Sequence, residues 1–263
     1  MIDAHIHTHF SPDSEAEPLE YLEEAIIKGI NHITFTDHTD LLYPHDMSFE
    51  FDLTKYDHMI SDLKQRYGHK VHIYKGIEMG LQKNCIIDSE LLLERFKPDF
   101  VLCSLHTVEG QDLYYGDFFS KHTPLEAIRI YLQTLLDIVK RFKTFNVIGH
   151  LDLPKRYQPA IYDVPLSEYV DLIDAIFDEI IPRGQGIEIN SSGLRGPHKR
   201  PFPDYEIIAH YIRRGGKIIT FGSDSHSADS LGVGYDLITE FLKHEGIKSL
   251  YVFKDMIGQE VPI

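Results

Sequence analysis

MIDAHIHTHFSPDSEA, residues 1–16, opens the chain with a short apolar strand pattern that runs into histidines. His5 and His7 are two residues apart, and residues with this spacing in a strand face the same side, so both imidazoles can point at one object. An affinity tag does not fit, because tags are runs of consecutive histidines and here Ile6 and Thr8 intervene. A single His-x-His pattern fits a metal site and an ordinary polar strand face equally well, so the rest of the chain has to distinguish them.

Short β-rich runs and longer helical patterns alternate along the whole chain. The predicted helices cover residues 18–29, 53–68, 88–96, 123–142, 167–181, 204–216 and 236–246. The strands predicted after the first cover residues 32–38, 71–80, 99–106, 145–152, 186–193 and 217–226, with a further short strand at 249–253. Thr123 and Pro124 suit the start of one helix, Gly29 suits the end of the first helix, and Asp13 or Ser14 could cap that helix.

Every strand of this alternating pattern ends in a residue that can bind metal or phosphate. In chain order these residues are His5 and His7, Asp37 and His38, Glu78, His106, His150 and Asp152, Asn190 and Arg195, and Asp224 and His226. One such residue is usually a cap or a turn residue, but seven consecutive strand ends are hard to explain in that way. In an open parallel sheet only the strands at the switch point converge on a site, whereas in a barrel every strand end faces one mouth. The pattern therefore favours a closed βα barrel.

Composition and charge narrow the class of protein. The 263 residues are 43% hydrophobic and 25% charged, as in ordinary globular domains. The formal net charge of −15 disfavours nucleic acid as a partner. Cys85 and Cys103 lie in apolar stretches and are expected to be reduced. No signal peptide or membrane span is recognisable, so a cytoplasmic protein without a membrane partner is expected.

The candidate ligands are histidines and carboxylates without cysteine. This set suits Zn, Fe or Mn in a catalytic site and argues against a structural zinc finger. One zinc ion needs about three protein ligands and a water molecule. The excess of candidates therefore predicts two or three divalent metal ions with at least one bridging carboxylate. Such centres generate hydroxide at neutral pH and clamp phosphoryl oxygens during hydrolysis.

Several motifs together resemble the polymerase and histidinol phosphatase (PHP) superfamily. They are DAHIHT (3–8), FTDH (35–38), the isolated Glu78, SLH (104–106), GHLD (149–152) and GSDSH (222–226). Within that superfamily, HFSPDS, GIEMG, GHLDLPKRY and INSSGLR are similar to PHP-type histidinol-phosphate phosphatases. The resemblance covers essentially the whole chain. It implies a single domain over residues 1–263, with a distorted seven-stranded (β/α)7 barrel that holds a trinuclear metal centre.

The resemblance also implies which residues bind the metals. The first site would comprise His5, His7, Glu78 and Asp224, the second would share Glu78 and add His106 and His150, and the third would comprise Asp13, His38 and His226. Asp13 keeps its alternative interpretation as the cap of the first helix. The other histidines, including His9, are expected to be surface or helix residues. Asp3, Asp37 and Asp152 could orient ligating histidines or could be turn caps.

Two arginines in loops after adjacent strands, Arg156 and Arg195, are predicted to bind phosphate. A planar guanidinium can hold a phosphate with two hydrogen bonds, and the family resemblance supports this role. Lys155 and Lys199 are weaker candidates. The expected activity is metal-dependent hydrolysis of L-histidinol phosphate to L-histidinol and phosphate by a metal-bridging hydroxide. The alternatives are a broader phosphoesterase acting on other small phosphate esters or mononucleotides, a 3′–5′ exonuclease, and a non-catalytic metal-storing or regulatory domain.

Overall fold

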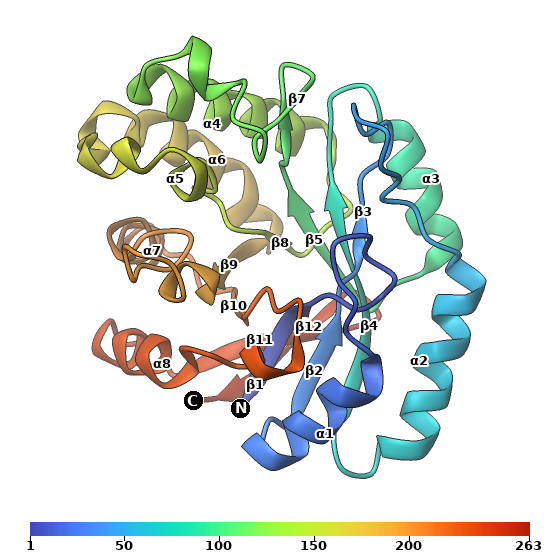
Figure 1. The fold of residues 1–263 in the computed structure, drawn as a ribbon. Coiled ribbons are helices and arrows are strands. Elements are labelled where there is room, and N and C mark those ends of the chain that lie inside the picture. The colour runs from blue at the N-terminus through green and yellow to red at the C-terminus, as the bar shows by residue number, and fades with distance from the viewer.

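A parallel sheet curled into a nearly closed barrel forms the centre of the computed structural model, which describes residues 1–263 (Figure 1). Its strands are hydrogen-bonded in the order β1-β2-β4-β5-β8-β9-β10. Their bounds are β1 Ile2–Ile6, β2 His32–Phe35, β4 His72–Gly80, β5 Phe100–Ser104, β8 Val147–Ile148, β9 Gly186–Asn190 and β10 Ile219–Gly222. The seven strand positions coincide with the predicted strands, so the expected distorted (β/α)7 barrel is confirmed.

The distortion has two sources. β2 pairs with β4 only up to Lys75, and β3 (His38–Thr39) pairs with β4 further along, at Glu78 and Met79. β1 and β10 close the ring mainly at their carboxyl ends. There the N–H of Asp224 donates to the carbonyl of His5 at 2.8 Å, and the N–H of His7 donates to the carbonyl of Ser225 at 2.8 Å. The closure is therefore made by the same segments that carry candidate ligands.

Helices surround the barrel (Figure 1). The long helices are α1 Pro18–Lys28, α2 Leu53–Tyr67, α3 Ile86–Phe96, α4 Pro124–Arg141, α6 Val170–Ile180, α7 Tyr205–Arg213 and α8 Tyr235–His244. A short hairpin and a short helix follow β5 and β8, namely β6 Thr107–Val108, β7 Gln111–Asp112 and α5 Pro154–Tyr157. Single 3-10 turns connect other elements at Phe119–Lys121, Pro159–Asp163, Leu166–Glu168, Ile181–Arg183, Ser191–Leu194 and Ala228–Ser230.

The helix ends test the predicted caps. Thr123 caps α4 and forms a capping box with Glu126, as the sequence predicts. Gly29 ends α1 in the left-handed conformation that glycine favours. The prediction that Asp13 or Ser14 caps α1 is wrong, because Glu17 is the cap residue. The Ser14 hydroxyl instead donates to the carbonyl of His7 at 3.0 Å, which draws this loop toward the barrel.

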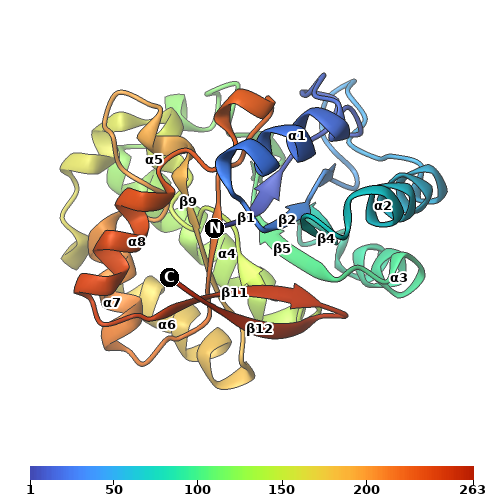
Figure 2. The same ribbon diagram turned by 90° about the horizontal axis from the view of Figure 1, so that it is seen from below.

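A two-stranded hairpin, β11 (Ser249–Lys254) and β12 (Ile257–Pro262), lies across the lower part of the molecule (Figure 2). The sequence predicts β11 and misses β12. Leu250, Val252 and Phe253 are buried, and the Phe253 ring stacks on Phe100 at the start of β5 with 5.3 Å between centroids. The hairpin therefore covers the amino ends of the barrel strands, which we call the floor.

The Asp99 carboxylate fastens the hairpin to the floor. Its Oδ2 accepts the N–H of Lys75 in β4 at 2.9 Å, and its Oδ1 accepts the N–H of Asp255 in the hairpin turn at 3.1 Å. The N–H of Met256 donates to the Asp99 carbonyl at 2.9 Å. Two backbone donors from distant segments thus depend on one side chain.

The interior holds a single apolar cluster of 68 buried residues, which includes Cys85 and Cys103. Both cysteines are free, as predicted. None of the helices is both long and apolar enough to cross a membrane.

Candidate metal centre

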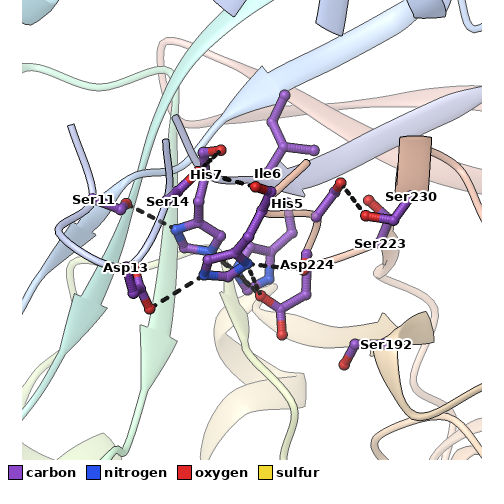
Figure 3. Close-up of polar contacts among 12 residues, drawn as sticks. His5, Ile6, His7, Ser11, Asp13, Ser14, Ser192, Ser223, Asp224 and Ser230 are labelled. Carbon is purple, nitrogen blue, oxygen red and sulfur yellow. Dashed lines mark hydrogen bonds and ion pairs between the residues drawn. The ribbon is translucent and has the colours of Figure 1, made fainter. Parts of the chain in front are cut away.

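All nine predicted metal ligands lie together at the carboxyl ends of the barrel strands, which we call the mouth. Six of them are buried: His5, His7, His38, Glu78, His150 and Asp224. His106 and His226 are half-buried and Asp13 is exposed, all three lining one cavity. The loop after β1 supplies Asp13, and Figure 3 shows the side chains of His5 and His7 pointing toward Asp224. Asp13 is not the cap of α1, because Glu17 takes that position, and the metal binding of Asp13 stays a prediction.

Glu78, near the end of β4, lies at the centre of this group. One of its oxygens, Oε2, faces three imidazole nitrogens, those of His5 at 3.2 Å, His7 at 3.4 Å and His38 at 2.9 Å. The other oxygen, Oε1, faces those of His106 at 3.2 Å and His150 at 2.8 Å. Ser104 donates its hydroxyl to Oε1 at 2.7 Å. A carboxylate whose two oxygens face separate sets of imidazoles has the geometry of a bridging ligand.

A second group lies on the side of Asp13. The ring of His7 is stacked between those of His38 and His226, with centroid distances of 4.1 and 4.2 Å. Oδ2 of Asp13 is 3.5 Å from Nε2 of His38 and 3.3 Å from Nε2 of His226. The three residues predicted for the third site therefore do approach one another.

The spacing of the ligand atoms fits divalent cations. Donor atoms about 2.1 Å from a tetrahedral zinc ion lie about 3.4 Å from one another. Nε2 of His7 is 3.4 Å from both Glu78 Oε2 and Asp224 Oδ1. Nδ1 of His38 is 2.9 Å from Glu78 Oε2. Four groups of three metal-capable residues each bring one ligand atom apiece to within 4.8 Å of one another: His7, His38 and His226; His5, His7 and Asp224; His38, Asp40 and His106; and Glu78, His106 and His150.

The charges of the mouth favour bound cations as well. Burial lowers the pKa of His38, but the carboxylates of Glu78 and Asp13 outweigh it and raise that pKa to about 10. Burial raises the pKa of Glu78, but His5, His38 and His106 outweigh it and hold that pKa well below its usual range. Burial and neighbouring imidazoles both lower the pKa of His7. The carboxylates thus require positive charge in the mouth, from protons or from metal ions.

Three candidate ligand rings are held by residues that sequence reasoning missed. Nδ1 of His5 contacts Glu188 Oε1 at 2.6 Å, and Nδ1 of His106 contacts Asp40 Oδ2 at 2.7 Å. Nδ1 of His7 contacts the hydroxyl of Ser11 at 3.0 Å (Figure 3). Glu188 is visible in the sequence as a charged residue inside the apolar strand GIEIN, and Asp40 follows His38 by two residues in TDHTD.

The three aspartates considered for that role contact no imidazole. Asp3 accepts the N–H groups of Ser223 and Gly232, which fastens the segment after β10 to β1. Asp37 accepts the N–H of Thr8 at 2.6 Å. Asp152 pairs with the buried ammonium of Lys155 at 3.0 Å. These carboxylates hold the loops of the mouth rather than the ligand rings.

Two candidate ligands have strained backbones. His150 has a φ of 26° and Asp224 a φ of 53°, in the left-handed region that residues with a Cβ adopt at a cost. Both follow glycine-containing strand ends, in GHLD and GSDSH. Strain of this kind concentrates at functional sites, where surrounding contacts hold it.

A cavity of about 310 Å³ opens onto the candidate ligands. Seven of the nine candidate ligands line it. Aromatic and apolar side chains enclose the rest: Tyr43, Met47, Phe49, Leu113, Tyr114, Tyr115, Leu153 and Tyr157. Asp112 also lines the cavity and accepts the Tyr43 hydroxyl at 2.6 Å. The cavity can therefore receive a small molecule with a flat, partly polar group.

The two arginines occupy different positions beside this cavity. Nη2 of Arg156 donates to Asp224 Oδ2 at 2.8 Å, and its side chain lines both this cavity and a neighbouring one of about 290 Å³. Arg195 donates to the carbonyls of Ser223 at 2.8 Å and Asp224 at 3.1 Å and lines only the neighbouring cavity. Lys155 is buried in its ion pair, Lys199 lines neither cavity, and His9 is exposed.

Comparison with known proteins agrees with this architecture. The model of the PHP domain family matches residues 3–192. Histidinol-phosphatase from Lactococcus lactis is 31% identical over 257 residues, which is 97% of this chain and 95% of that protein. Histidinol-phosphatase from Bacillus subtilis is 26% identical, over 90% of this chain and 98% of that protein.

A solved structure extends the likeness to three dimensions. The crystal structure of histidinol phosphate phosphatase from Lactococcus lactis, complexed with zinc, L-histidinol and phosphate, superimposes with a TM-score of 0.91 at 31% identity. The match covers 98% of both chains. The family match, the barrel and the sequence likeness agree, and the chain belongs to the PHP domain family.

Proposed function

We propose that this protein is a metal-dependent phosphomonoesterase that hydrolyses L-histidinol phosphate to L-histidinol and phosphate. The observation that carries the proposal is Glu78, whose two oxygens face five imidazoles at the bottom of a cavity sized for a small molecule. The Lactococcus lactis relative, of nearly the same length and fold, binds zinc, L-histidinol and phosphate. Histidine biosynthesis is the pathway that such an activity serves.

We infer two or three divalent ions, of Zn, Fe or Mn, in the mouth. The first would be held by His5, His7, Glu78 and Asp224, the second by Glu78, His106 and His150, and the third by Asp13, His38 and His226. Ions in such a centre activate water for attack and neutralise phosphoryl oxygens. The histidine and carboxylate donor set and its spacing support this assignment.

The remaining residues of the mouth bind and orient the ester. Arg156 has a half-buried guanidinium, with 30% of its side chain exposed, and faces the cavity beside Asp224. It is therefore placed to hold a phosphoryl group against the ligand cluster. Arg195 approaches from the neighbouring cavity and would hold the phosphate from a second direction. The aromatic side chains around the cavity would shield the leaving group from water.

The catalytic domain would extend over residues 1–263. The family match ends at residue 192, whereas β10, Asp224 and His226 come later in the chain. β10 closes the barrel against β1, and β11 of the floor hairpin packs against β10. Truncation after residue 192 would remove two candidate ligands together with the closing strand.

Phosphate release from three substrates tests the proposal. Histidinol phosphate, a mononucleotide and an aryl phosphate are compared with and without a chelator. We expect chelator-sensitive release that is fastest with histidinol phosphate. Similar rates on all three esters would indicate a broader phosphoesterase. No chelator-sensitive release from any of them would contradict the proposal.

A further inference from the structure

Glu188 is a buried carboxylate for which the reaction itself has no evident need. It is the middle residue of β9, is fully buried, and lies outside the proposed ligand set. An isolated carboxylate in such a place is costly unless it accepts hydrogen bonds. Its partners therefore indicate what it is for.

Both of its oxygens accept hydrogen bonds from candidate metal ligands. Oε1 contacts Nδ1 of His5 at 2.6 Å, and Oε2 accepts the backbone N–H of His150 at 2.9 Å. The amide of Asn190 also donates to Oε2, at 3.3 Å. His5 and His150 belong to two different proposed metal sites, so one side chain contacts both.

The contact between Glu188 and His5 joins two strands, β9 and β1, that are not neighbours in the sheet. β10 lies between β9 and β1 in the barrel, and Gly222 of β10 leaves the space for it. A Cβ at Gly222 would lie 2.1 Å from Glu188 Oε1 and 2.5 Å from the Cβ of His5. The glycine of the GSDSH motif is thus required for the carboxylate of β9 to reach the ring on β1.

The contact with His150 holds a strained residue. His150 has a φ of 26°, and its N–H points to Glu188 rather than into a strand ladder. Without an acceptor this buried N–H would have no partner, and the residue would be free to leave its conformation.

We propose that Glu188 is a positioning residue that sets the metal-binding tautomer of His5 and the backbone of His150 together. The inference rests on the metal centre of the proposed function. With Nε2 of His5 turned toward a metal ion, the ring proton is on Nδ1, where Glu188 accepts it. A single carboxylate thereby couples two neighbouring metal sites.

The proposal explains why the residue is a carboxylate and not an amide. Both principal partners are donors, and a glutamate offers one accepting oxygen to each. A glutamine has only one such oxygen. Its NH2 group would face either the N–H of His150 or Nδ1 of His5, and in the second case it would favour the His5 tautomer whose Nε2 is protonated.

The test compares zinc binding by the wild-type protein and Glu188→Gln. Zinc affinity is measured by competition with a chromophoric chelator, and long-range ¹H–¹⁵N spectra of the zinc-loaded proteins report the tautomer of His5. We expect Glu188→Gln to weaken zinc binding about ten- to a hundredfold. We also expect the spectra to show that the Nδ1–H, Nε2-bound form of His5 is lost or mixed.

Asp99→Asn is the matched control. Asp99 likewise accepts N–H groups of two segments through separate oxygens, but it lies at the floor, away from the ligands. This variant should bind zinc with wild-type affinity. Glu188→Asp keeps two acceptors on a shorter side chain, so it should retain the His5 tautomer and bind zinc with intermediate affinity, which provides a second test if Glu188→Gln does not fold.

Three results would overturn the inference. Wild-type zinc affinity in Glu188→Gln would show that Glu188 does not position the ligands. An equal loss in Asp99→Asn would reduce its role to general stability. If the wild-type protein takes up no zinc, the metal centre of the proposed function is refuted. This result differs from a failure of the Glu188 inference alone, because it is seen in the wild-type protein before any substitution is made.

Discussion

The mouth of the barrel surrounds one buried carboxylate with five imidazoles, whereas its floor is covered by a hairpin with apolar side chains and hydrogen-bonded backbone. At the mouth, buried charges and strained residues cost folding free energy, and bound cations would offset the cost of the buried charges. At the floor, Phe253 and Asp99 make contacts that stabilise the fold in any state of the site. Binding and stability are therefore assigned to opposite ends of the same strands, and substitutions at the two ends should have separable effects.

The largest effect is expected from Glu78→Gln at the mouth. The substitution removes the charge that the first and second of the three proposed metal sites share, so phosphate release from histidinol phosphate should fall by about a thousandfold or more. Circular dichroism should show an unchanged fold, because the backbone of β4 keeps its ladder with β5. Elemental analysis should show fewer ions per chain than in the wild-type protein. Activity within tenfold of wild type would remove Glu78 from the centre of the mechanism.

Phe253→Ala at the floor should affect stability instead. Phe253 is buried and stacks on Phe100, and the loss of such a side chain leaves a cavity that costs about 3–5 kcal/mol. Urea denaturation should show this decrease in the free energy of unfolding. Under conditions where the variant is folded, its zinc content and its rate of phosphate release should match those of the wild-type protein. Loss of zinc from the folded variant would show that the two ends are not independent.

The two arginines should differ in their contribution to catalysis. Arg156→Ala should lower kcat/KM, and the decrease should correspond to a loss of about 2–4 kcal/mol of transition-state stabilisation. This is the range for a charge-assisted contact in a shielded site. Arg195→Ala should have a smaller effect, because Arg195 lines only the neighbouring cavity. Arg156→Lys should recover part of the loss, since an ammonium cannot form two parallel bonds to a phosphate. Equal, near-wild-type kinetics in both alanine variants would argue against a phosphate site beside Asp224.

The smallest effect concerns the pH dependence of the floor. Burial raises the pKa of Asp99, but hydrogen bonds from the Lys75 and Asp255 N–H groups and the charge of Lys64 outweigh it and lower the pKa below its ordinary value. A lowered folded-state pKa contributes stability that is present above the unfolded-state pKa of about 3.9 and is lost as pH falls toward the folded-state pKa.

Asp99→Asn should therefore cost roughly 1–2 kcal/mol of unfolding free energy at neutral pH, through one unsatisfied N–H group. The difference between the variant and the wild-type protein should shrink below about pH 4. Urea unfolding of both proteins at neutral and acidic pH measures this difference in unfolding free energy. The titration of the mouth histidines contributes equally to both proteins and cancels in the difference. A difference that grows in acid would have the wrong sign for this explanation.

The strand ends were predictable because a parallel βα alternation determines both where each strand stops and which way its end faces. His38, His150 and Asp224 could be placed at one mouth from order and spacing alone. Whether they bind metal stays a prediction, but the structure brings them together as that argument requires.

Contacts that cross between strands were not predictable in the same way. Glu188 reaches His5 past β10 because residue 222 is glycine, and no local pattern in GIEIN reveals that neighbour. Asp37 and Asp152 are nearer to the histidines in sequence, yet their carboxylates accept a backbone N–H and an ammonium. β12 was missed for a related reason: its side chains are mostly exposed, so it lacks the apolar pattern that marks a buried strand.

The positive φ angles of His150 and Asp224 bear on attempts to engineer this protein. Glycine at either position would relieve the backbone, and a selection for heat resistance alone would reward the exchange. The same exchange would delete an imidazole or a carboxylate from the mouth. Variants selected for thermal stability without an activity screen should therefore accumulate changes at residues 150 and 224 and lose function. These two positions should be held constant in any thermostability library.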